Sequence, residues 1–218
     1  MKKPQHEAVA ARADDERADA ARVAAAAQLA CLLEVTAPKP GNVSPGRHFA
    51  DTRYEDFLAS AAAIGAPLAG AGDRPIGATV RLAIESTSCW TRSNTNLGIV
   101  LLFAPIARAA LTLVESSRSS DDRCHDLRNG VALALERTDV EDARDVYAAI
   151  RQASPGGLGR ADEQDVAEEP TDSLLEVMRL AAHRDGIARE YATGFERTFE
   201  SGVPALARAR GDGLSWDD

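Results

Sequence analysis

The chain is 218 residues long, a length that one hydrophobic core can serve, and it carries a formal net charge of −9. This charge, and the absence of a basic run with interleaved aromatic residues, argue against nucleic acid as a main partner. Hydrophobic residues make up 44 % of the chain but aromatic residues only 5 %. That balance favours closely packed helices over β-branched strands, so we predict an all-α, single-domain helical bundle with polar loops at one end.

Targeting signals and covalent cross-links are not evident in the sequence. No apolar run reaches about 18 residues, and the charges spread through the N-terminal region are untypical of a signal peptide. The three cysteines, at positions 31, 89 and 124, lack a C-x-x-C spacing, which speaks against disulfides and a zinc ribbon. We expect a cytoplasmic protein without a membrane partner, and we leave homo-oligomerisation open.

Three regions of the chain differ in composition. Residues 1–20 are polar and rich in Ala, Asp and Arg, and they form a predicted N-terminal extension, either a frayed helix or a disordered tail. Residues 21–210 combine apolar-faced helical segments with polar loops and form the predicted helical domain. Residues 211–218 form a polar C-terminal tail.

The first two predicted helices flank a proline-containing loop. An Ala-rich run with spaced leucines predicts a helix over residues 23–35, which Pro38 and Pro40 end. Thr52 and Glu55 have the spacing of a capping box. A second helix is therefore expected to begin at Thr52.

The middle of the chain contains the most apolar segment. A Gly- and Pro-containing stretch at residues 70–75 ends the second helix, and residues 76–88 form a third helix with one apolar face. Residues 97–114 are long and apolar and predict the central buried helix. Pro105 lies within it, so we expect a kink or an early break there.

The C-terminal third predicts three more helices. Residues 125–136 form the first, and Thr138 and Glu141 have the spacing of a second capping box, which opens the next. The last predicted helix begins at Thr171 and runs through Asp185 towards residue 199.

A single lysine lies between two prolines in the segment 34–43. Lys39 is the only lysine outside the N-terminal tail, Pro38 and Pro40 fix the backbone on either side of it, and Gly41 lets the backbone approach a ligand closely. Such a loop offers one ammonium and backbone N–H groups to phosphate. The alternative is an ordinary helix-ending turn with a solvated lysine.

A second polar segment precedes the central helix. Residues 93–98 read Ser-Asn-Thr-Asn-Leu-Gly, which places short amides and hydroxyls at the start of a buried helix. The N–H groups and the dipole at such a start favour anions. Simple N-capping of the helix explains the same residues equally well.

Carboxylates suited to Mg²⁺ or to general-base work occur in several segments. Asp185 is one of them, although an i,i+4 ion pair with Arg189 is an alternative role. The four histidines show no metal-ligand spacing, so no transition-metal cofactor is predicted, and only His48 is kept as a candidate participant. The candidate carboxylates are Glu34, Asp51, Glu163, Asp165 and Asp185.

Several of these motifs together resemble one known family. The segment 34–43 with its Pro-Lys-Pro-Gly element, residues 48–51 (His-Phe-Ala-Asp), Phe57 and Ser60 in a Phe-x-x-Ser helix, and the Asn-Thr pair at 94–95 are similar to the triphosphoribosyl-dephospho-CoA synthase family. The resemblance covers most of the chain, and Asp185 falls where that family has an Asp in a C-terminal helix.

The resemblance implies an all-helical transferase that joins ATP to 3′-dephospho-CoA, releases adenine and uses Mg²⁺. It implies catalytic roles for Asp51 and Asp185, and metal binding by these two with Glu34. We therefore expect Lys39, Asp51, Asn94 and Asp185 to converge on one pocket. The implied nucleotide-binding residues are Lys39, Gly41, Asn42, Ser60, Asn94, Thr95 and Asn96.

The chain departs from the family pattern at one place. Members carry a His-Lys pair after Asn-Thr, where this chain has Asn96 and Leu97. Losing a lysine from a polyphosphate site costs a charge-assisted hydrogen bond. Two alternatives therefore stay open: a nucleotide or ribosyl transferase with another ribosyl acceptor in tetrahydromethanopterin-linked one-carbon metabolism, or a non-catalytic nucleotide-binding helical protein.

Overall fold

The computed structural model describes residues 3–113, 120–156, 159–161 and 163–215, apart from the side chains of residues 3–13, 120 and 121. Within these ranges the chain forms helices and loops without a strand, which confirms the predicted all-α, single-domain fold. In chain order the elements are α1 (Lys3–Thr36), α2 (Tyr54–Ala63), α3 (Gly65–Ala69), the 3₁₀ helix η1 (Ala71–Asp73), α4 (Ile76–Ser88), α5 (Leu97–Thr112), α6 (Ser120–Glu136), α7 (Val140–Ala153), α8 (Leu174–Ala181), α9 (Gly186–Thr193), the π-helix η2 (Thr198–Gly202) and α10 (Val203–Gly211).

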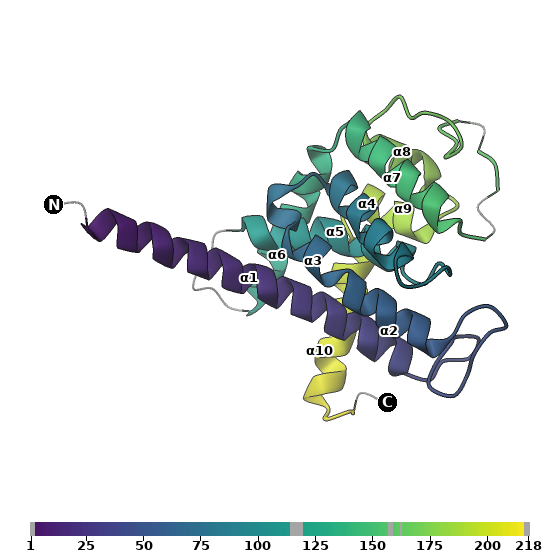
Figure 1. Cartoon of the computed structure of the whole chain (residues 1–218), viewed down its shortest axis with the longest axis horizontal. Helices are drawn as coiled ribbons and strands as arrows, with labels where there is room; N and C mark the ends of the chain where they lie inside the picture. Colours follow the sequence, from purple (N-terminus) through teal and green to yellow (C-terminus); the bar gives the residue numbers. More distant parts are fainter. Residues whose placement is uncertain (1–2, 114–119, 157–158, 162, 216–218) are drawn as a thin grey trace.

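Helix α1 is longer than the sequence pattern predicts. It begins at Lys3 rather than near residue 23, so residues 3–20 continue the first helix, and in Figure 1 this part projects away from the other helices. Ala-rich sequence has high helix propensity even where it lacks an apolar face. Residues 1–2 and 216–218, at the ends of the predicted extension and tail, lie outside the described residues.

Helix α2 begins two residues later than predicted. Its N-cap is Arg53, whose backbone N–H donates to the Asp56 carboxylate at 2.8 Å. The predicted capping box of Thr52 and Glu55 is therefore wrong. The carboxylate at the third helical position, which the motif requires, belongs to Asp56.

Helix α7 likewise has a different cap from the predicted one. The Asp139 carboxylate accepts the N–H groups of Glu141 at 2.9 Å and Asp142 at 3.1 Å, so Asp139 is the N-cap and the box of Thr138 and Glu141 is wrong. The Thr138 hydroxyl is engaged elsewhere, because it accepts the N–H of Leu175 at 3.2 Å. It thereby joins the start of α7 to α8.

Helices α4 and α7 approach each other closely at Gly77. The N–H of Gly77 donates to the Asp142 carboxylate at 2.6 Å, and a Cβ at this position would lie 2.4 Å from the Asp142 carbonyl oxygen. Only glycine fits such an approach. Burial raises the pKa of Asp142, while the N–H groups of Gly77 and Asp139 act in the opposite direction.

Helix α5 is the centre of the bundle, as predicted, and in Figure 1 it lies among α4, α6, α7 and α9. It continues through Pro105 to Thr112, so the early break does not occur. Arg108 on α5 also holds the segment 70–75, which separates α3 from α4, against α5. Its Nη1 donates to the carbonyls of Gly72 at 2.5 Å and Arg74 at 3.1 Å.

The predicted helix from Thr171 towards residue 199 is divided in two. Helix α8 ends at Ala181, and α9 begins at Gly186. Asp185 lies at the division, where its carboxylate accepts the N–H of Ala188 at 2.8 Å and caps α9. A side-chain cap starts a new helix with a new direction, which the apolar spacing alone does not reveal.

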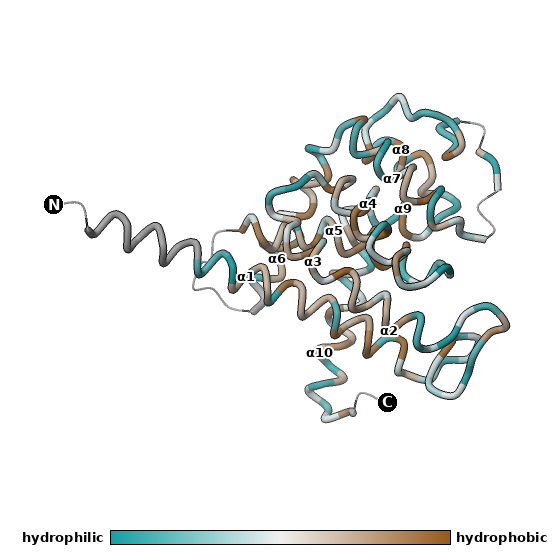
Figure 2. The backbone as a smooth tube through the Cα atoms, viewed as in Figure 1, coloured by the Kyte–Doolittle hydropathy of each residue, from teal (hydrophilic) through white to brown (hydrophobic). Residues whose placement is uncertain are grey.

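Hydropathy follows this arrangement. Figure 2 shows hydrophobic residues along α5 and the C-terminal part of α1, and mainly hydrophilic residues in the loop between α1 and α2. None of the helices described is both long and apolar enough to span a bilayer.

Candidate active site

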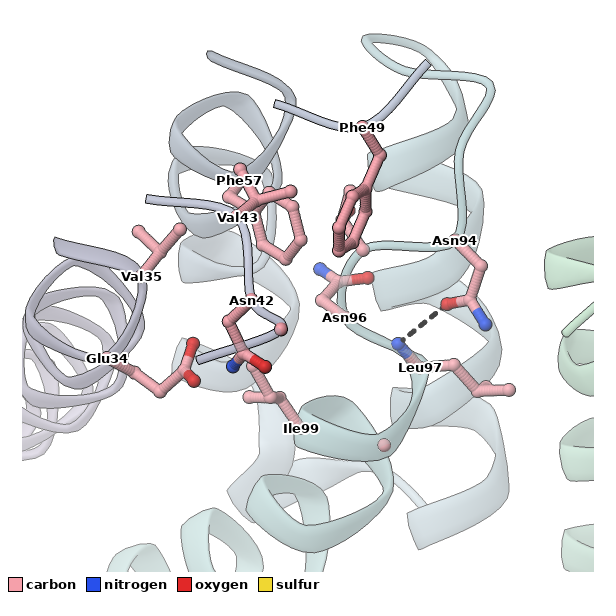
Figure 3. A pocket seen from close by; sticks show the side chains of 13 residues that line it. Glu34, Val35, Asn42, Val43, Phe49, Phe57, Asn94, Asn96, Leu97 and Ile99 are labelled. Carbon is pink, nitrogen blue, oxygen red and sulfur yellow. Dashed lines mark hydrogen bonds between the residues drawn. The ribbon is translucent and has the colours of Figure 1, made fainter. Parts of the chain in front are cut away.

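Two polar segments that are far apart in the sequence meet beside the start of α5. They line a cavity of about 470 Å³, which we call the first cavity. Figure 3 shows Glu34 and Asn42 on one side of it and Asn96 and Leu97 on the other. Six of the residues singled out in the sequence line this cavity, namely Glu34, Gly41, Asn42, Asn94, Thr95 and Asn96.

A tight turn brings Asn42 to the first cavity. The N–H of Asn42 donates to the carbonyl of Lys39 at 3.2 Å. Pro40 at the second position and Gly41 at the third, with φ of +78°, match a type II β-turn. The positive φ is the physical reason for glycine at this position.

Lys39 does not line the first cavity but acts on a residue that does. Its Nζ donates to the Glu34 carboxylate at 2.5 Å and to the Glu34 carbonyl at 2.6 Å. The ammonium therefore satisfies a carbonyl in the last turn of α1 and neutralises the Glu34 carboxylate at the cavity edge.

Buried hydrogen bonds fix the polar segment ahead of α5. The hydroxyls of Ser60 and Thr95, both buried, share one hydrogen bond. Asn96 Nδ2 donates to Thr87 Oγ1 at 3.0 Å, also in the interior. Ser60, which the family resemblance placed among the nucleotide-binding residues, lies behind the cavity wall and supports Thr95 from α2.

The N-terminus of α5 opens onto the first cavity. Asn94 Oδ1 accepts the N–H of Leu97 at 3.2 Å, and Asn96 is the N-cap. Gly98 and Ile99 follow in the first turn, where N–H groups have no intrahelical partner, and both residues line the cavity. Such N–H groups, with the positive end of the helix dipole, attract anions.

Asp51 and His48 belong to the loop beside the first cavity and line no part of it. The carbonyl of Asp51 accepts the Ser93 hydroxyl at 2.8 Å, which ties the two polar segments together. The side chains of both Asp51 and His48 are exposed. In this structure Asp51 therefore contributes its backbone to the site.

A larger cavity of about 850 Å³, which we call the second cavity, adjoins the first. Asn94, Leu97 and Gly98 line both, so the start of α5 separates them. Asp185 lines the second cavity, together with Glu163 and Asp165 of the acidic loop.

The Asp185 carboxylate has one identified partner. Its Oδ1 accepts the N–H of Ala188, and no ion pair with Arg189 forms, because Arg189 Nε donates to the carbonyl of Ala182 at 3.2 Å. The alternative of an i,i+4 ion pair is therefore wrong. The side chain is exposed to solvent at the edge of the second cavity.

The four residues expected to converge on one pocket do not do so. Asn94 lines both cavities, Asp185 lines only the second, and Lys39 and Asp51 line neither. The expectation of a single shared pocket is replaced by two adjoining cavities with Asn94 between them.

The carboxylates of this region do not form a ready-made metal centre. No group of three or more His, Cys, Asp or Glu side chains among the described residues is placed to hold a metal ion. Mg²⁺, however, is commonly held by one or two carboxylates together with substrate phosphates. Glu34 at the first cavity and Asp185 at the second fit that pattern.

Sequence reasoning missed several residues that line the cavities. Phe49 and Phe57 line the first, and Arg160, His183 and Arg184 line the second. Phe49 and Phe57 belong to the motifs that carry the family resemblance. Arg184 directly precedes Asp185, but its place beside α5 depends on the break between α8 and α9.

Comparison with known proteins agrees with the resemblance seen in the sequence. A sequence model of the CitG family, described as ATP:dephospho-CoA triphosphoribosyl transferase, matches residues 20–218. No curated protein and no solved structure matches the chain. Because the family match spans almost the whole chain, the predicted family is confirmed. The protein therefore belongs to the CitG family and is a triphosphoribosyl transferase of that family.

Proposed function

We propose that the first cavity binds ATP and that the triphosphoribosyl group of this ATP passes to 3′-dephospho-CoA. The observation that carries the proposal is that five of the seven implied nucleotide-binding residues, together with the implied metal ligand Glu34, line one cavity at the N-terminus of α5. The family match supports the same reaction. Both substrates are intracellular metabolites, which supports a cytoplasmic location.

The reaction is a displacement at the anomeric carbon of the ATP ribose. The bond from C1′ to the adenine nitrogen breaks, and its electron pair leaves with adenine, which takes up a proton. The 2′-hydroxyl of the acceptor forms a new bond to C1′ and loses its proton. The site has to hold three phosphates and to accept that proton.

The first turn of α5 is suited to the triphosphate. The N–H groups of Gly98 and Ile99 and the helix dipole supply positive potential at the wall of the first cavity. The side-chain amide of Asn42 adds a donor from the opposite side. These groups take over part of the role that the missing lysine has in the family pattern.

A Mg²⁺ ion bound with ATP would be held by Glu34 and the phosphate oxygens, and it would screen the phosphate charge. Lys39 forms an ion pair of 2.5 Å with the Glu34 carboxylate. Its positive charge therefore reduces the repulsion between that carboxylate and the phosphates of ATP. We assign Asp185 as the base for the acceptor hydroxyl, because its carboxylate is exposed at the second cavity, which Asn94 also lines, and because the family resemblance implies a catalytic role for it.

The decisive experiment measures adenine release from ATP in the presence of Mg²⁺ and dephospho-CoA by chromatography. The test variant is Asn94→Ala, which removes the side chain shared by both cavities. The matched control is Asn129→Ala, an exposed asparagine on α6. Adenine release by the wild type and by Asn129→Ala, together with its loss in Asn94→Ala, supports the proposal.

Absence of adenine release from the wild-type protein would overturn the proposal. The remaining functions are then distinguished by the same assay with other ribosyl acceptors, including pterin-linked ones, and by direct titration of ATP binding. ATP binding without any product would favour a non-catalytic nucleotide-binding protein.

A further inference from the structure

The second cavity differs from the first in size and in lining. It has about 850 Å³, near the upper end of ordinary small-molecule sites. Its inner wall is apolar and formed by buried side chains from α5, α7 and α8, namely Leu101, Ile150, Val177 and Met178. Such a wall binds an aliphatic chain by removing apolar surface from water.

Two guanidinium groups also belong to the lining of the second cavity. Arg160 and Arg184 both line it and are both exposed. No ion pair between either of them and another described residue is formed. Their donors are therefore available to an anion, and a guanidinium fits phosphate oxygens through two parallel hydrogen bonds.

One carboxylate of the second cavity is engaged by backbone N–H groups. Asp165 accepts the N–H of Ala161 at 2.6 Å and the N–H of Ala167 at 2.8 Å, so it holds the acidic loop in shape. These two N–H groups chiefly lower the pKa of Asp165, and the charges of Arg160 and Arg184 lower it further. Arg160, Arg184 and Asp165 all line the second cavity.

We propose that the second cavity binds the acceptor, with the diphosphate of dephospho-CoA at Arg184 and Arg160 and its pantetheine arm along the apolar wall. This inference rests on the proposed function. Dephospho-CoA is the longer of the two substrates and combines a dianionic diphosphate with a long, weakly polar chain. The second cavity offers both kinds of group, two guanidinium groups without an ion pair to a described residue and an apolar wall, and its lining also contains the carboxylates of Glu163, Asp165 and Asp185.

The position of the second cavity suits an acceptor site. It shares Asn94, Leu97 and Gly98 with the first cavity, so ligands in the two cavities meet at the start of α5. Leu97 occupies the place where the family pattern has a lysine. An apolar residue at this junction leaves the anion-binding role in the second cavity to the two arginines.

The test measures binding without turnover. Dephospho-CoA and ATP are titrated separately into the wild type, into Arg184→Ala and into Arg179→Ala by calorimetry, with and without Mg²⁺. Arg179 is a matched control, because it is an exposed arginine on α8 that pairs with Glu176 and lines neither cavity. Pantetheine, which lacks the diphosphate, is titrated as a third ligand.

We expect Arg184→Ala to weaken dephospho-CoA binding about tenfold, the effect of one charge-assisted hydrogen bond, and to leave ATP and pantetheine binding unchanged. Unchanged ATP binding also shows that the variant folds. Three outcomes would overturn the proposal: equal dephospho-CoA affinity in Arg184→Ala and wild type, a loss of ATP affinity instead, or no binding of dephospho-CoA to the wild type.

The same titrations separate this proposal from the proposed function. If dephospho-CoA binds and depends on Arg184 but no adenine is released, the acceptor site stands and the transfer reaction does not. If adenine is released at equal rates and equal acceptor KM by wild type and Arg184→Ala, the reaction stands and the assignment of the second cavity fails.

Discussion

The hydroxyl of Tyr191 on α9 donates to the carbonyl oxygen of Leu101 on α5 at 2.7 Å. That carbonyl is the one that Pro105, four residues later and without an N–H, cannot satisfy. Tyr191 is fully buried, and burial raises the pKa of its hydroxyl well above the usual range, so it stays a neutral donor. The proline in the central helix is thus compensated from a neighbouring helix.

Replacing Tyr191 by Phe should destabilise the fold. The substitution leaves the Leu101 carbonyl buried without a donor, which costs about 1–3 kcal/mol of the free energy of unfolding. Urea denaturation followed by circular dichroism measures the change. Tyr54→Phe is the control, because the Tyr54 hydroxyl contacts Thr36 at the surface, and it should cost much less. Equal effects of the two variants would contradict this role of Tyr191.

The close approach of α4 and α7 predicts a second stability effect. In Gly77→Ala, the new Cβ would lie 2.4 Å from the Asp142 carbonyl oxygen, so the two helices must separate. We expect a loss of about 1–3 kcal/mol, typical of overpacking. Gly211→Ala, where a Cβ meets no atom within 4 Å, should be near neutral. Thermal unfolding of both variants decides the matter, and a neutral Gly77→Ala would refute the close contact.

Lys39 should affect ATP binding through Glu34. Lys39→Ala leaves the Glu34 carboxylate uncompensated at the wall of the first cavity, where it repels phosphate. We expect the KM for ATP to rise about tenfold, with a smaller effect on kcat. Arg81→Ala removes an equal charge from an ion pair on α4 and should leave the KM unchanged. An unaltered KM in Lys39→Ala would remove Lys39 from the site.

Asp185 has a structural and a proposed chemical role, which two substitutions separate. Asn at position 185 keeps an oxygen to cap α9 but cannot accept a proton, so Asp185→Asn should lower kcat roughly 100-fold with little loss of stability. Asp185→Ala loses the cap as well and should cost about 1 kcal/mol. Initial-rate kinetics and thermal unfolding measure both effects. An active Asp185→Asn enzyme would exclude Asp185 as the base.

The cysteines should differ in reactivity. Burial, and secondly the charge of Glu34, raise the pKa of the Cys31 thiol to about 11, whereas Cys89 is exposed. Since the thiolate is the reactive form, at pH 8 alkylation should reach Cys89 first and Cys31 last. The rate at Cys31 should rise towards pH 11, where its thiolate forms. Mass spectrometry of peptides reads out the order, and denatured protein, in which every thiol reacts, is the control.

The same raised pKa fixes the sign of a stability effect. The Cys31 thiol is held in its protonated form in the folded state, so its contribution to stability is complete below about pH 9. It is lost as the pH rises from there through about 11. Replacing Cys31 by Ala should remove this part of the alkaline destabilisation.

Local sequence signals were sufficient for the helices whose ends depend on nearby residues. Helix α4 has the predicted bounds, because Pro75 precedes a regular apolar face that ends in a polar segment. Where a cap decides the boundary, the prediction was one or two residues off, as at Arg53 and Asp139. Several neighbouring residues can serve as a cap, and tertiary contacts choose among them.

The first cavity was accessible to prediction because its residues belong to two short segments with recognisable motifs. The second cavity was not, because its wall combines α5, α7, α8 and the acidic loop. Asp185 was identified but placed inside a helix, and the turn that exposes it beside Arg184 was missed. Side chains brought together over such sequence distances carry no shared local pattern.

The first turn of α5 is common to both cavities, and this has a geometrical consequence. If two reactants occupied sites on separate mobile elements, their distance would vary with the motion of each element. Here both would lie at a single helix end, which the Asn94 side chain caps and the buried hydrogen bond from Asn96 to Thr87 holds in place. Any shift of α5 would then move ATP and the acceptor molecule together and preserve their mutual alignment.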